Sequence, residues 1–565
     1  MNYQKYKETI LELIDKKRKA IVFLVFWGIF LIGLNIFTDY GVHYDEYANQ
    51  AFGRSANKCI RDALYRDSRT SELFSSPTAR HDLIHGPAFE LFLTFTKEKL
   101  LKLTDSRDII FMRHLLTFLV FYLGVFFFYL LCKFHFKSWK MGILGSLFLI
   151  LHPRIFSHSF YNSVDIPFLS FYILGTYTLI RYLEKKTYPR AIFHALACAI
   201  LINIRAVGVI LPLSTFIFLA MDTIRFRKHK EEIRKIVKTA LLYTLLLTGL
   251  VFLFCPLLWK NPIGNFFEIL NRTAKFQRAD TSPAVWNYHL KWIGLTTPLL
   301  YSLCFFIGLL LSIKDIFRSP IKFFHQNRTI LIALFLLFVP LILPHIYKTS
   351  LYDGWRHHYF IYPIFLIFSL TGVAALFRLA KTKFHGWSYK FINTVFILII
   401  VISLKNTVQF MVKYHPHQYV YANILAGRDM GGVKARDALD YWGLSYRKGL
   451  EYILKTDKSD KIKVCLGYGR NNIPILPAND RKRLVFVKTM DKADYFLGNY
   501  KHSGGYIWSR GDYPKQEEYY SLKFGEVKFM VVYKLKNLLP RKAPDTLHKI
   551  SDLFVTPPGR SNLTQ

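Results

Sequence analysis

Residues 108–132 read DIIFMRHLLTFLVFYLGVFFFYLLC, an apolar run long enough to cross a lipid bilayer as a helix. Similar runs recur along most of the 565-residue chain. Hydrophobic residues make up 52% of the sequence and charged residues 20%, below the roughly 25% usual for soluble globular chains. These features exclude a soluble enzyme, a disordered chain and a fibrous repeat. They indicate a polytopic α-helical membrane protein.

The apolar runs predict about eleven transmembrane helices, if a span needs about 20 residues with tolerance for tilt and re-entrant pieces. The candidates lie at residues 20–38, 108–132, 141–157, 163–181, 190–204, 206–223, 239–258, 295–313, 329–346, 358–377 and 391–408. No small-residue cleavage site follows the first run, so we expect a first span rather than a cleaved signal peptide.

The formal net charge of +38 comes from 76 Lys and Arg against 38 Asp and Glu. The basic residues cluster between apolar runs, at residues 16–19, 181–190, 225–238, 314–328 and 378–390. Basic short loops stay cytoplasmic, so this pattern favours topology and membrane-surface attraction over nucleic-acid binding. With a cytoplasmic N-terminus, every cluster falls inside and everything after residue 408 falls outside. We therefore expect a multi-pass plasma (inner) membrane protein whose C-terminal part is periplasmic or extracellular.

The chain divides into a membrane module at 1–408, a soluble α/β domain at 409–540 and a loose tail at 541–565. Residues 39–107 form a long, polar first outer loop inside the module. Within the α/β domain, a helix is expected over 434–455, and the strand signals are Lys461–Leu466, Leu484–Val487 and Val527–Tyr533. The six cysteines show no CxxC pair, so neither a disulfide framework nor a zinc site is expected.

Two adjacent acids, Asp45 and Glu46, follow the first span within the sequence His43-Tyr44-Asp45-Glu46-Tyr47. Such a pair can act as general base, bind a metal or recognise a cation. Solvated loop acids are the simpler explanation for an arbitrary pair. The aromatic flanks and the position at the membrane interface favour a functional role.

The short loop between the third and fourth spans holds His152, Arg154 and Asp165 beside lipid. Asp165 precedes Ile-Pro and suits the first turn of the fourth span, where a carboxylate also complements the helix dipole. A plain N-terminal cap would explain it equally well.

Basic side chains also stand at other predicted outer ends. His85, in His85-Gly86-Pro87, precedes the apolar stretch Ala88–Phe95, and a turn that starts an amphipathic helix explains it best. Arg205 could bind an anion or extend its charge to the interface. Arg356 and His357 precede the tenth span and could hold a phosphate by charge-assisted hydrogen bonds.

Together, the outer loops supply carboxylates, arginines and histidines beside the grooves between spans. Transfer of a group from a lipid-linked phosphate requires this combination. A base deprotonates the acceptor hydroxyl, cations stabilise the departing phosphate, and the grooves hold the lipid tail.

The sequence resembles the GT-C glycosyltransferase superfamily at these residues. It looks closest to the bacterial branch related to protein O-mannosyltransferases and to the lipid A aminoarabinose transferase. The topology of about residues 15–405 carries the resemblance, with Asp45-Glu46, the His85-x-Pro87 turn and Asp165-Ile-Pro167 as local anchors.

The resemblance implies an enzyme that takes a sugar from a polyprenyl-phosphate carrier on the non-cytoplasmic face, with inversion at the anomeric carbon. It implies that Asp45 is the catalytic base, that Glu46 positions the acceptor or the base, and that Asp165 is a second acid facing the site. Some members of the superfamily use a divalent cation and others do not, so no cofactor is assigned and metal binding stays open. The acceptor could be a lipid, a glycan or a protein hydroxyl.

Two other functions are compatible with a polytopic chain. A transporter or flippase of lipid-linked sugars usually shows paired repeats and charges near the midplane of the bilayer, and neither is visible here. A non-catalytic receptor or assembly protein would act through the C-terminal domain. In that domain, His415-Pro416 and Asp440-Tyr441-Trp442-Gly443 are interpreted as packing, with acceptor recognition as the alternative.

Overall fold

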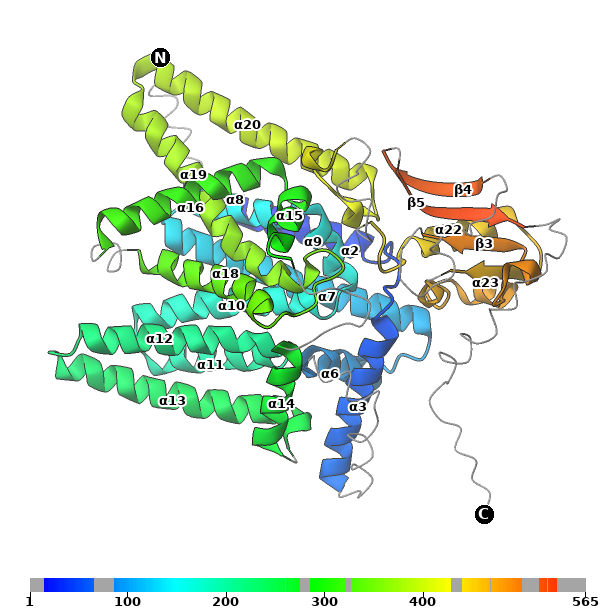
Figure 1. The fold of residues 1–565 in the computed structure, drawn as a ribbon, viewed down its shortest axis with the longest axis horizontal. Helices are drawn as coiled ribbons and strands as arrows, with labels where there is room; N and C mark the ends of the chain where they lie inside the picture. Colours follow the sequence, from blue (N-terminus) through cyan, green and yellow to red (C-terminus); the bar gives the residue numbers. More distant parts are fainter. Residues whose placement is uncertain are drawn as a thin grey trace.

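The computed structural model describes residues 15–65, 86–259, 261–274, 285–320, 327–427, 439–467, 469–499, 518–525 and 527–535. Most of these residues form one bundle of long helices, with a small sheet at one end (Figure 1). Nine described helices are long and apolar enough to span a membrane. They are α2 (Arg18–Ile36), α7 (Ser106–Phe136), α10 (Asp165–Glu184), α12 (Ile210–Arg225, after a 3-10 turn at Ala206–Val209), α13 (Lys230–Phe254), α16 (Leu299–Arg318), α18 (Arg328–Ile346), α19 (Tyr362–Lys383, after a 3-10 turn at Arg356–Ile361) and α20 (Gly386–Lys413).

The two other predicted spans take a different form. The segment at 141–157 is a pair of helices, α8 (Trp139–Ile150) and α9 (Pro153–Tyr161), bent by 72° at the break between them. Pro153 stands in the first turn of α9, and the His152 side chain accepts a hydrogen bond from the Ile155 amide at 3.3 Å. The prediction of a loop between the third and fourth spans is therefore wrong over Pro153–Tyr161, because a proline in the first turn and a capping side chain start a new helix there. The segment at 190–204 is the shorter apolar helix α11 (Tyr188–Ile202).

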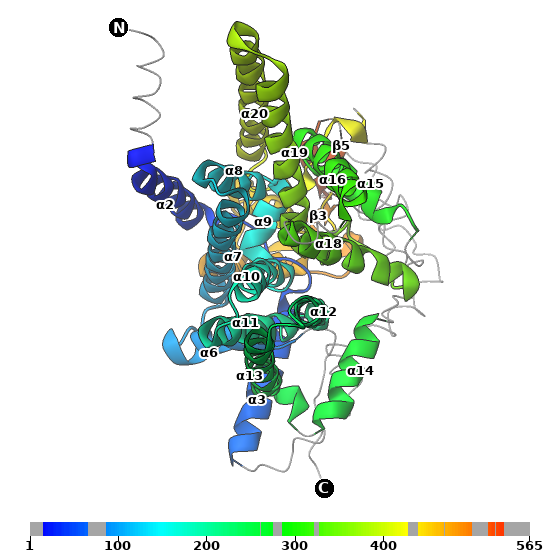
Figure 2. The same ribbon diagram turned by 90° about the vertical axis from the view of Figure 1, so that its left-hand side faces the viewer.

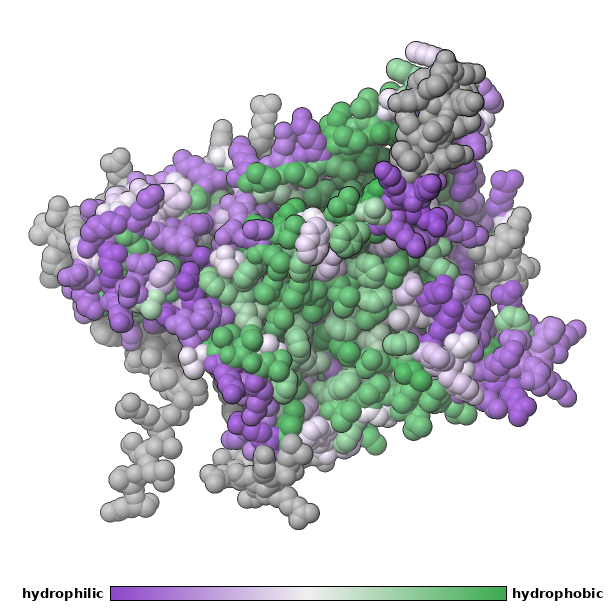
Figure 3. Space-filling model, turned by 180° about the vertical axis from the view of Figure 1, so that it is seen from behind, coloured by the Kyte–Doolittle hydropathy of each residue, from purple (hydrophilic) through white to green (hydrophobic). Residues whose placement is uncertain are grey.

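The face of the bundle shown in Figure 3 is a wide hydrophobic belt between two hydrophilic ends. On α13, apolar side chains such as Leu241 and Leu245 are exposed. Because lipid tails solvate such surfaces and water does not, the belt fits a bilayer. The expected fold class, a polytopic helical membrane protein with a small C-terminal α/β domain, is confirmed.

Helix α10 lies in the middle of the bundle, and α2 and α20 lie at its border (Figure 2). Within the most apolar 18-residue stretch of each helix, 72% of the residues of α10 are buried, but only 11% of those of α2 and of α20. Helix α10 therefore carries its first residue, Asp165, into the protein interior and not to lipid.

Helices α16 and α19 approach each other most closely at two glycines. A Cβ at Gly308 would collide with the Phe368 carbonyl oxygen, and one at Gly372 would collide with the Cys304 carbonyl oxygen. Small residues permit this backbone approach in membrane helices.

Several shorter helices do not span the bundle: α3 (Glu46–Tyr65), α6 (Ala88–Phe95, followed by a π turn at Thr96–Leu100), α14 (Pro262–Ala274) and α15 (Tyr288–Thr296). Helices α3 and α14 run across the direction of α12 and α13 (Figure 1). The helix predicted after His85-Gly86-Pro87 is α6, with the expected bounds.

The C-terminal sheet has the order β2-β1-β3-β5-β4. Its strands are β1 (Ile462–Leu466), β2 (Leu484–Phe486), β3 (Tyr495–Gly498), β4 (Glu518–Phe524) and β5 (Val527–Lys534), with helices α22 (Tyr446–Thr456) and α23 (Ala478–Arg483). Strand β1 pairs in parallel with β2 and β3, whereas β5 pairs antiparallel with β3 and β4. The three predicted strands are confirmed to within a residue at each end.

The helix predicted over 434–455 is wrong in its first half. Residues 434–438 lie outside the described residues, and α22 begins only at Tyr446. Before it, the Asp440 carboxylate accepts hydrogen bonds from the Leu444 and Ser445 amides at 2.9 and 3.1 Å, and Gly443 takes a positive φ of 70°. A local carboxylate that binds backbone amides favours a turn over a helix. The tail at 541–565 lies outside the described residues, and the domain limits stay a prediction.

Candidate active site

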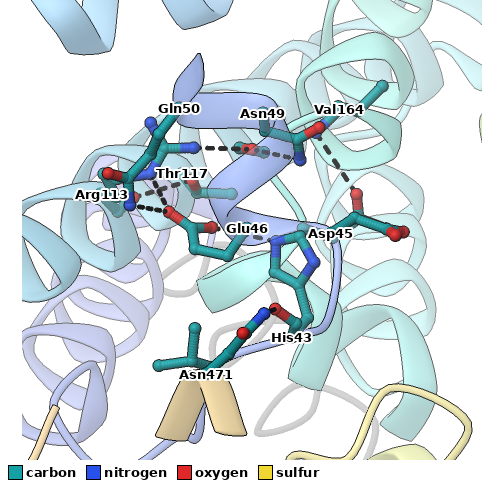
Figure 4. Close-up of polar contacts among 12 residues, drawn as sticks. His43, Asp45, Glu46, Asn49, Gln50, Arg113, Thr117, Val164 and Asn471 are labelled. Carbon is teal, nitrogen blue, oxygen red and sulfur yellow. Dashed lines mark hydrogen bonds and ion pairs between the residues drawn. The ribbon is translucent and has the colours of Figure 1, made fainter. Parts of the chain in front are cut away.

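The two acids of the first loop point in different directions at the start of α3. Figure 4 shows Glu46 pointing toward Arg113 and Asp45 pointing to the other side of the helix start. The Glu46 side chain is 2% exposed and that of Asp45 is 44% exposed. Consecutive side chains on one turn diverge, so adjacency in the sequence does not make these acids act on the same group.

Glu46 belongs to a buried ionic network. Its carboxylate contacts the Arg113 guanidinium and lies 3.0 Å from His43 Nε2. Arg113 also donates to both oxygens of Glu90, at 2.9 and 3.0 Å. Burial alone would raise the pKa of the Glu46 carboxyl, but Arg113 and His43 outweigh burial and hold that pKa well below its ordinary value. Glu46 is therefore an anchor that joins α3 to α7.

Asp165 begins α10 and is buried among polar groups. One carboxylate oxygen contacts Arg205 Nη1. The other accepts from Asn162 Nδ2 at 2.9 Å and lies 3.3 Å from Arg356 Nη1. Two guanidiniums thus share this carboxylate, and its charge keeps both cations at one place in the protein interior.

Arg356 connects Asp165 with the first loop. Its Nη2 lies 3.1 Å from Asp353 Oδ2 and 4.0 Å from Asp45 Oδ2. The guanidinium carbon stands 4.6 Å from the centre of the Trp442 ring, a cation–π arrangement. Asp45 and Asp165, expected to face one site, therefore both neighbour the same guanidinium.

The other predicted residues lie in several environments. His152 caps α9 and is fully buried, with its ring centre 4.6 Å from that of Tyr362 in an edge-on arrangement. Arg154 is also buried, and its Nε donates to the Tyr421 carbonyl at 2.8 Å. The half-buried His357 ring lies 4.8 Å from that of Tyr352. His85 lies outside the described residues.

The structure brings together four of the predicted residues: Asp45, Asp165, Arg205 and Arg356. It adds neighbours that the sequence reasoning did not select: Asp353, Trp442, Arg113 and Glu90. Arg113 carried a usable signal, because it is a charge inside an apolar run. No pattern of the sequence pairs Trp442 with Arg356.

The described residues contain no group of three or more His, Cys, Asp or Glu side chains arranged to hold a metal ion. Around the candidate site, Asp45, Asp165 and Asp353 all neighbour the Arg356 guanidinium. These carboxylates already have a cation between them, so we assign no metal ligands.

A separate cavity of about 380 Å³ lies where the C-terminal sheet domain meets the start of α7. Its lining includes Arg107 of α7 and Arg447, Lys455 and Arg483 of the C-terminal domain. None of the predicted site residues lines it, so this cavity does not belong to the candidate active site.

Comparison with known proteins gives a family match in sequence and similar solved structures. Residues 99–259 match the family described as dolichyl-phosphate-mannose-protein mannosyltransferase. No curated protein matches the chain. Crystal structures of ArnT from Cupriavidus metallidurans align with 11% identity when bound to undecaprenyl phosphate and 12% identity in the apo state. The alignments cover 91% and 92% of this chain and 98% of each ArnT chain, with TM-scores of 0.41 and 0.42.

The matched segment covers less than a third of the chain and includes Arg113, Asp165 and Arg205, but neither Asp45 nor Arg356. Over residues 99–259 the chain is similar to the dolichyl-phosphate-mannose-protein mannosyltransferases, and the resemblance to GT-C glycosyltransferases inferred from the sequence is confirmed.

Proposed function

We propose that this chain is an integral membrane glycosyltransferase that moves a sugar from a polyprenyl-phosphate donor to an acceptor hydroxyl, with inversion, on the non-cytoplasmic face. The observation that carries the proposal is the shared guanidinium: Arg356 neighbours a half-exposed carboxylate, Asp45, and a buried one, Asp165. One centre thus holds an accessible base beside fixed positive charge. The mannosyltransferase match supports the reaction class.

Asp45 is the general base of this proposal. Its exposed carboxylate can reach an acceptor hydroxyl, whereas Glu46 is enclosed by Arg113 and His43. The acceptor oxygen attacks the anomeric carbon, the bond from that carbon to the phosphate oxygen breaks, and the acceptor proton passes to Asp45. Because phosphate leaves without a proton, no separate general acid is required.

Arg205 and Arg356 stabilise the departing phosphate. A guanidinium offers several donors in one plane and binds phosphate through pairs of hydrogen bonds. Asp165 holds both guanidiniums through opposite carboxylate oxygens. Fixed donors of this kind stabilise charge that develops in the transition state without reorganising during the reaction.

Glu46 has a positioning role here. Its network with Arg113 and Glu90 fixes the first residue of α3, and Asp45 is the preceding residue. The ionic network thus restrains the backbone that carries the proposed base.

The sidedness of the site is inferred from charge. The sheet lies at one end of the bundle, and the turns from α12 to α13 and from α19 to α20 lie away from it (Figure 1). Basic clusters occupy both turns, at 225–238 and 378–390. Short basic loops remain cytoplasmic, which supports a site and a sheet domain on the opposite face.

Purified protein in detergent, supplied with a labelled polyprenyl-phosphate sugar and a panel of acceptors, tests the proposal. Labelled sugar on an acceptor hydroxyl, in the anomeric configuration opposite to that of the donor, is the expected result. Movement of intact donor across proteoliposomes with no cleavage would instead establish the flippase alternative. Protein denatured by heat is the control for uncatalysed breakdown of the donor.

A further inference from the structure

The chain segment that leads to Asp45 is bound on its backbone by the C-terminal sheet domain. Asn472 Oδ1 accepts from the Val42 amide at 2.8 Å, and Asn472 Nδ2 donates to the Val42 carbonyl at 3.1 Å. Asn471 Nδ2 donates to the carbonyls of His43 and Tyr44, at 3.2 and 2.6 Å. Two neighbouring asparagines therefore hold three consecutive residues immediately before the proposed base.

These contacts are specific to a backbone path, because they involve carbonyl and amide groups. Side chains at 42–44 could change without removing them, whereas a shift of the segment would break them. Arg447 adds a further bond of the same kind, from Nη1 to the Tyr40 carbonyl at 2.8 Å. Asn471 and its labelled partner His43 are both drawn in Figure 4, beside Asp45 and Glu46.

The same domain also contacts the cationic side of the site, through Trp442. This side chain is 4% exposed. One neighbour is the Arg356 guanidinium, and another is the His43 ring, whose centre lies 4.8 Å from that of Trp442. A guanidinium over an aromatic face has a preferred plane, so the indole restricts how Arg356 turns.

The turn that presents Trp442 is itself well fixed. The Asp440 carboxylate caps the following backbone, and the Asp440 carbonyl accepts from Asn499 Nδ2 at 2.7 Å. Tyr441 Oη lies 3.0 Å from Nε2 of His158 in α9. The turn is thus tied both to its own domain and to the helical bundle.

We propose that the C-terminal sheet domain is a positioning part of the active site, which fixes Asp45 through Asn471 and Asn472 and orients Arg356 through Trp442. This inference rests on the proposed function for its kinetic consequence, although the contacts themselves do not. Asn471, Asn472 and Trp442 touch no reacting atom in this proposal. They act through the base and through the phosphate-binding guanidinium.

A different contact of the same domain provides a matched control. Arg481 pairs with Asp105 and donates to the Ser106 hydroxyl at 2.6 Å, near the start of α7. This contact also joins the domain to the bundle, yet it includes neither the 40–44 backbone nor Arg356. Arg481 also donates to the Pro474 carbonyl of its own domain at 2.9 Å. Arg481→Ala therefore weakens docking while it removes none of the contacts made by Asn471, Asn472 and Trp442.

The experiment compares the full-length variants Asn471→Ala, Trp442→Ala, Trp442→Phe and Arg481→Ala with the parent protein. Donor turnover gives kcat and KM, thermal unfolding gives the folded fraction, and hydrogen exchange followed by mass spectrometry reports the peptide covering 40–46. We expect Asn471→Ala and Trp442→Ala to lower kcat by about 10- to 100-fold with a smaller change in KM, as misplaced catalytic groups do. Trp442→Phe should recover most of kcat, because it keeps an aromatic face, and Arg481→Ala should keep kcat near that of the parent.

Hydrogen exchange separates this inference from the proposed function. Asn471→Ala should speed exchange in the 40–46 peptide, and Arg481→Ala should not, whether or not the donor is cleaved. A parent protein without transferase activity would refute the proposed function and leave the exchange comparison to decide the positioning role. Equal exchange in Asn471→Ala and parent, or a fall in kcat that matches the loss of folded protein, would overturn the inference.

Discussion

Asp45 and Asp165 neighbour the same guanidinium, that of Arg356, although they are far apart in the sequence and differ in exposure. The buried Asp165 lies 3.3 Å from Arg356 Nη1, and the half-exposed Asp45 lies 4.0 Å from Arg356 Nη2. The buried carboxylate holds the cation in place, and in the proposed function the accessible carboxylate beside it receives the proton of the acceptor. The arrangement assigns different tasks to two residues of the same type.

Replacement of Asp45 by asparagine tests the base. Asp45→Asn keeps the size of the side chain and removes its ability to take a proton, so transfer should fall by about 10²- to 10⁴-fold. Initial rates with the labelled donor measure the loss. Asp39→Asn is the matched control, since Asp39 is also partly exposed but pairs with His415. Transfer by Asp45→Asn at the parent rate would exclude Asp45 as the base.

Replacement of Arg356 by lysine tests the phosphate site. Lysine keeps the charge but lacks the planar fork that reaches Asp45, Asp165 and Asp353 together. We expect kcat to fall by about 10²-fold, the loss typical of one missing donor to a developing anion. Arg378→Lys, at an exposed position in the last turns of α19, should leave kcat unchanged.

A further variant, Arg205→Lys, should give a loss of similar size, because Arg205 is the other guanidinium on Asp165. If both lysine variants retain the parent kcat, the departing phosphate is stabilised elsewhere. Steady-state kinetics at saturating donor provides the comparison.

The depressed pKa of Glu46 predicts a dependence of stability on pH. A carboxyl whose pKa is lower in the folded chain than in the unfolded chain stabilises the fold fully above its unfolded pKa. This stabilisation is lost as pH falls below the unfolded value toward the lowered folded one. The thermal midpoint of the detergent-solubilised protein should therefore decrease as the pH is lowered from neutral to about 3. The decrease per pH unit should be larger than in Glu46→Gln.

Glu184→Gln is the control for this measurement. Glu184 pairs with Arg181 and Arg190 at the exposed end of α10, where ion pairs contribute little to stability. The thermal midpoint of Glu184→Gln should depend on pH in the same way as that of the parent protein. An identical slope in Glu46→Gln and parent would show that the Glu46 network does not contribute to acid sensitivity.

Cysteine labelling tests the proposed sidedness. All six native cysteines are buried, so a membrane-impermeant maleimide should react little with the parent protein. A cysteine in place of the exposed Asn479, in the sheet domain, should be labelled on intact cells. A cysteine in place of the exposed Lys228, between α12 and α13, should be labelled only after the membrane is opened. The reverse pattern would place the site in the cytosol.

The helices and strands that local sequence patterns determine were predictable. The apolar runs gave the long helices because burial in lipid requires a helix with all backbone groups paired. The position of Asp165 at the first turn of α10 and the three strands of the sheet domain also followed from local patterns. The break before α9 was missed, since its Pro153 lies within a stretch that also looks like a polar connection.

The site was predictable in part, for a different reason. Asp45, Asp165, Arg205 and Arg356 were selected because charges beside apolar runs are uncommon. Their division of roles depends on distant partners: Glu46 turns to Arg113, and Trp442 packs on Arg356. Such pairings are set by tertiary packing, and hydrophobic periodicity carries no information about them.

The two glycines between α16 and α19 limit which parts of the bundle can rearrange. With no side chain separating the backbones at Gly308 and Gly372, sliding one helix along the other would press neighbouring side chains against the opposite main chain. The pair should therefore move as a single rigid unit. Arg356 opens the 3-10 turn that leads into α19. If the proposed function holds, we therefore expect its guanidinium to keep its place during turnover, and the entry and exit of a long prenyl chain to depend on displacements among the other helices.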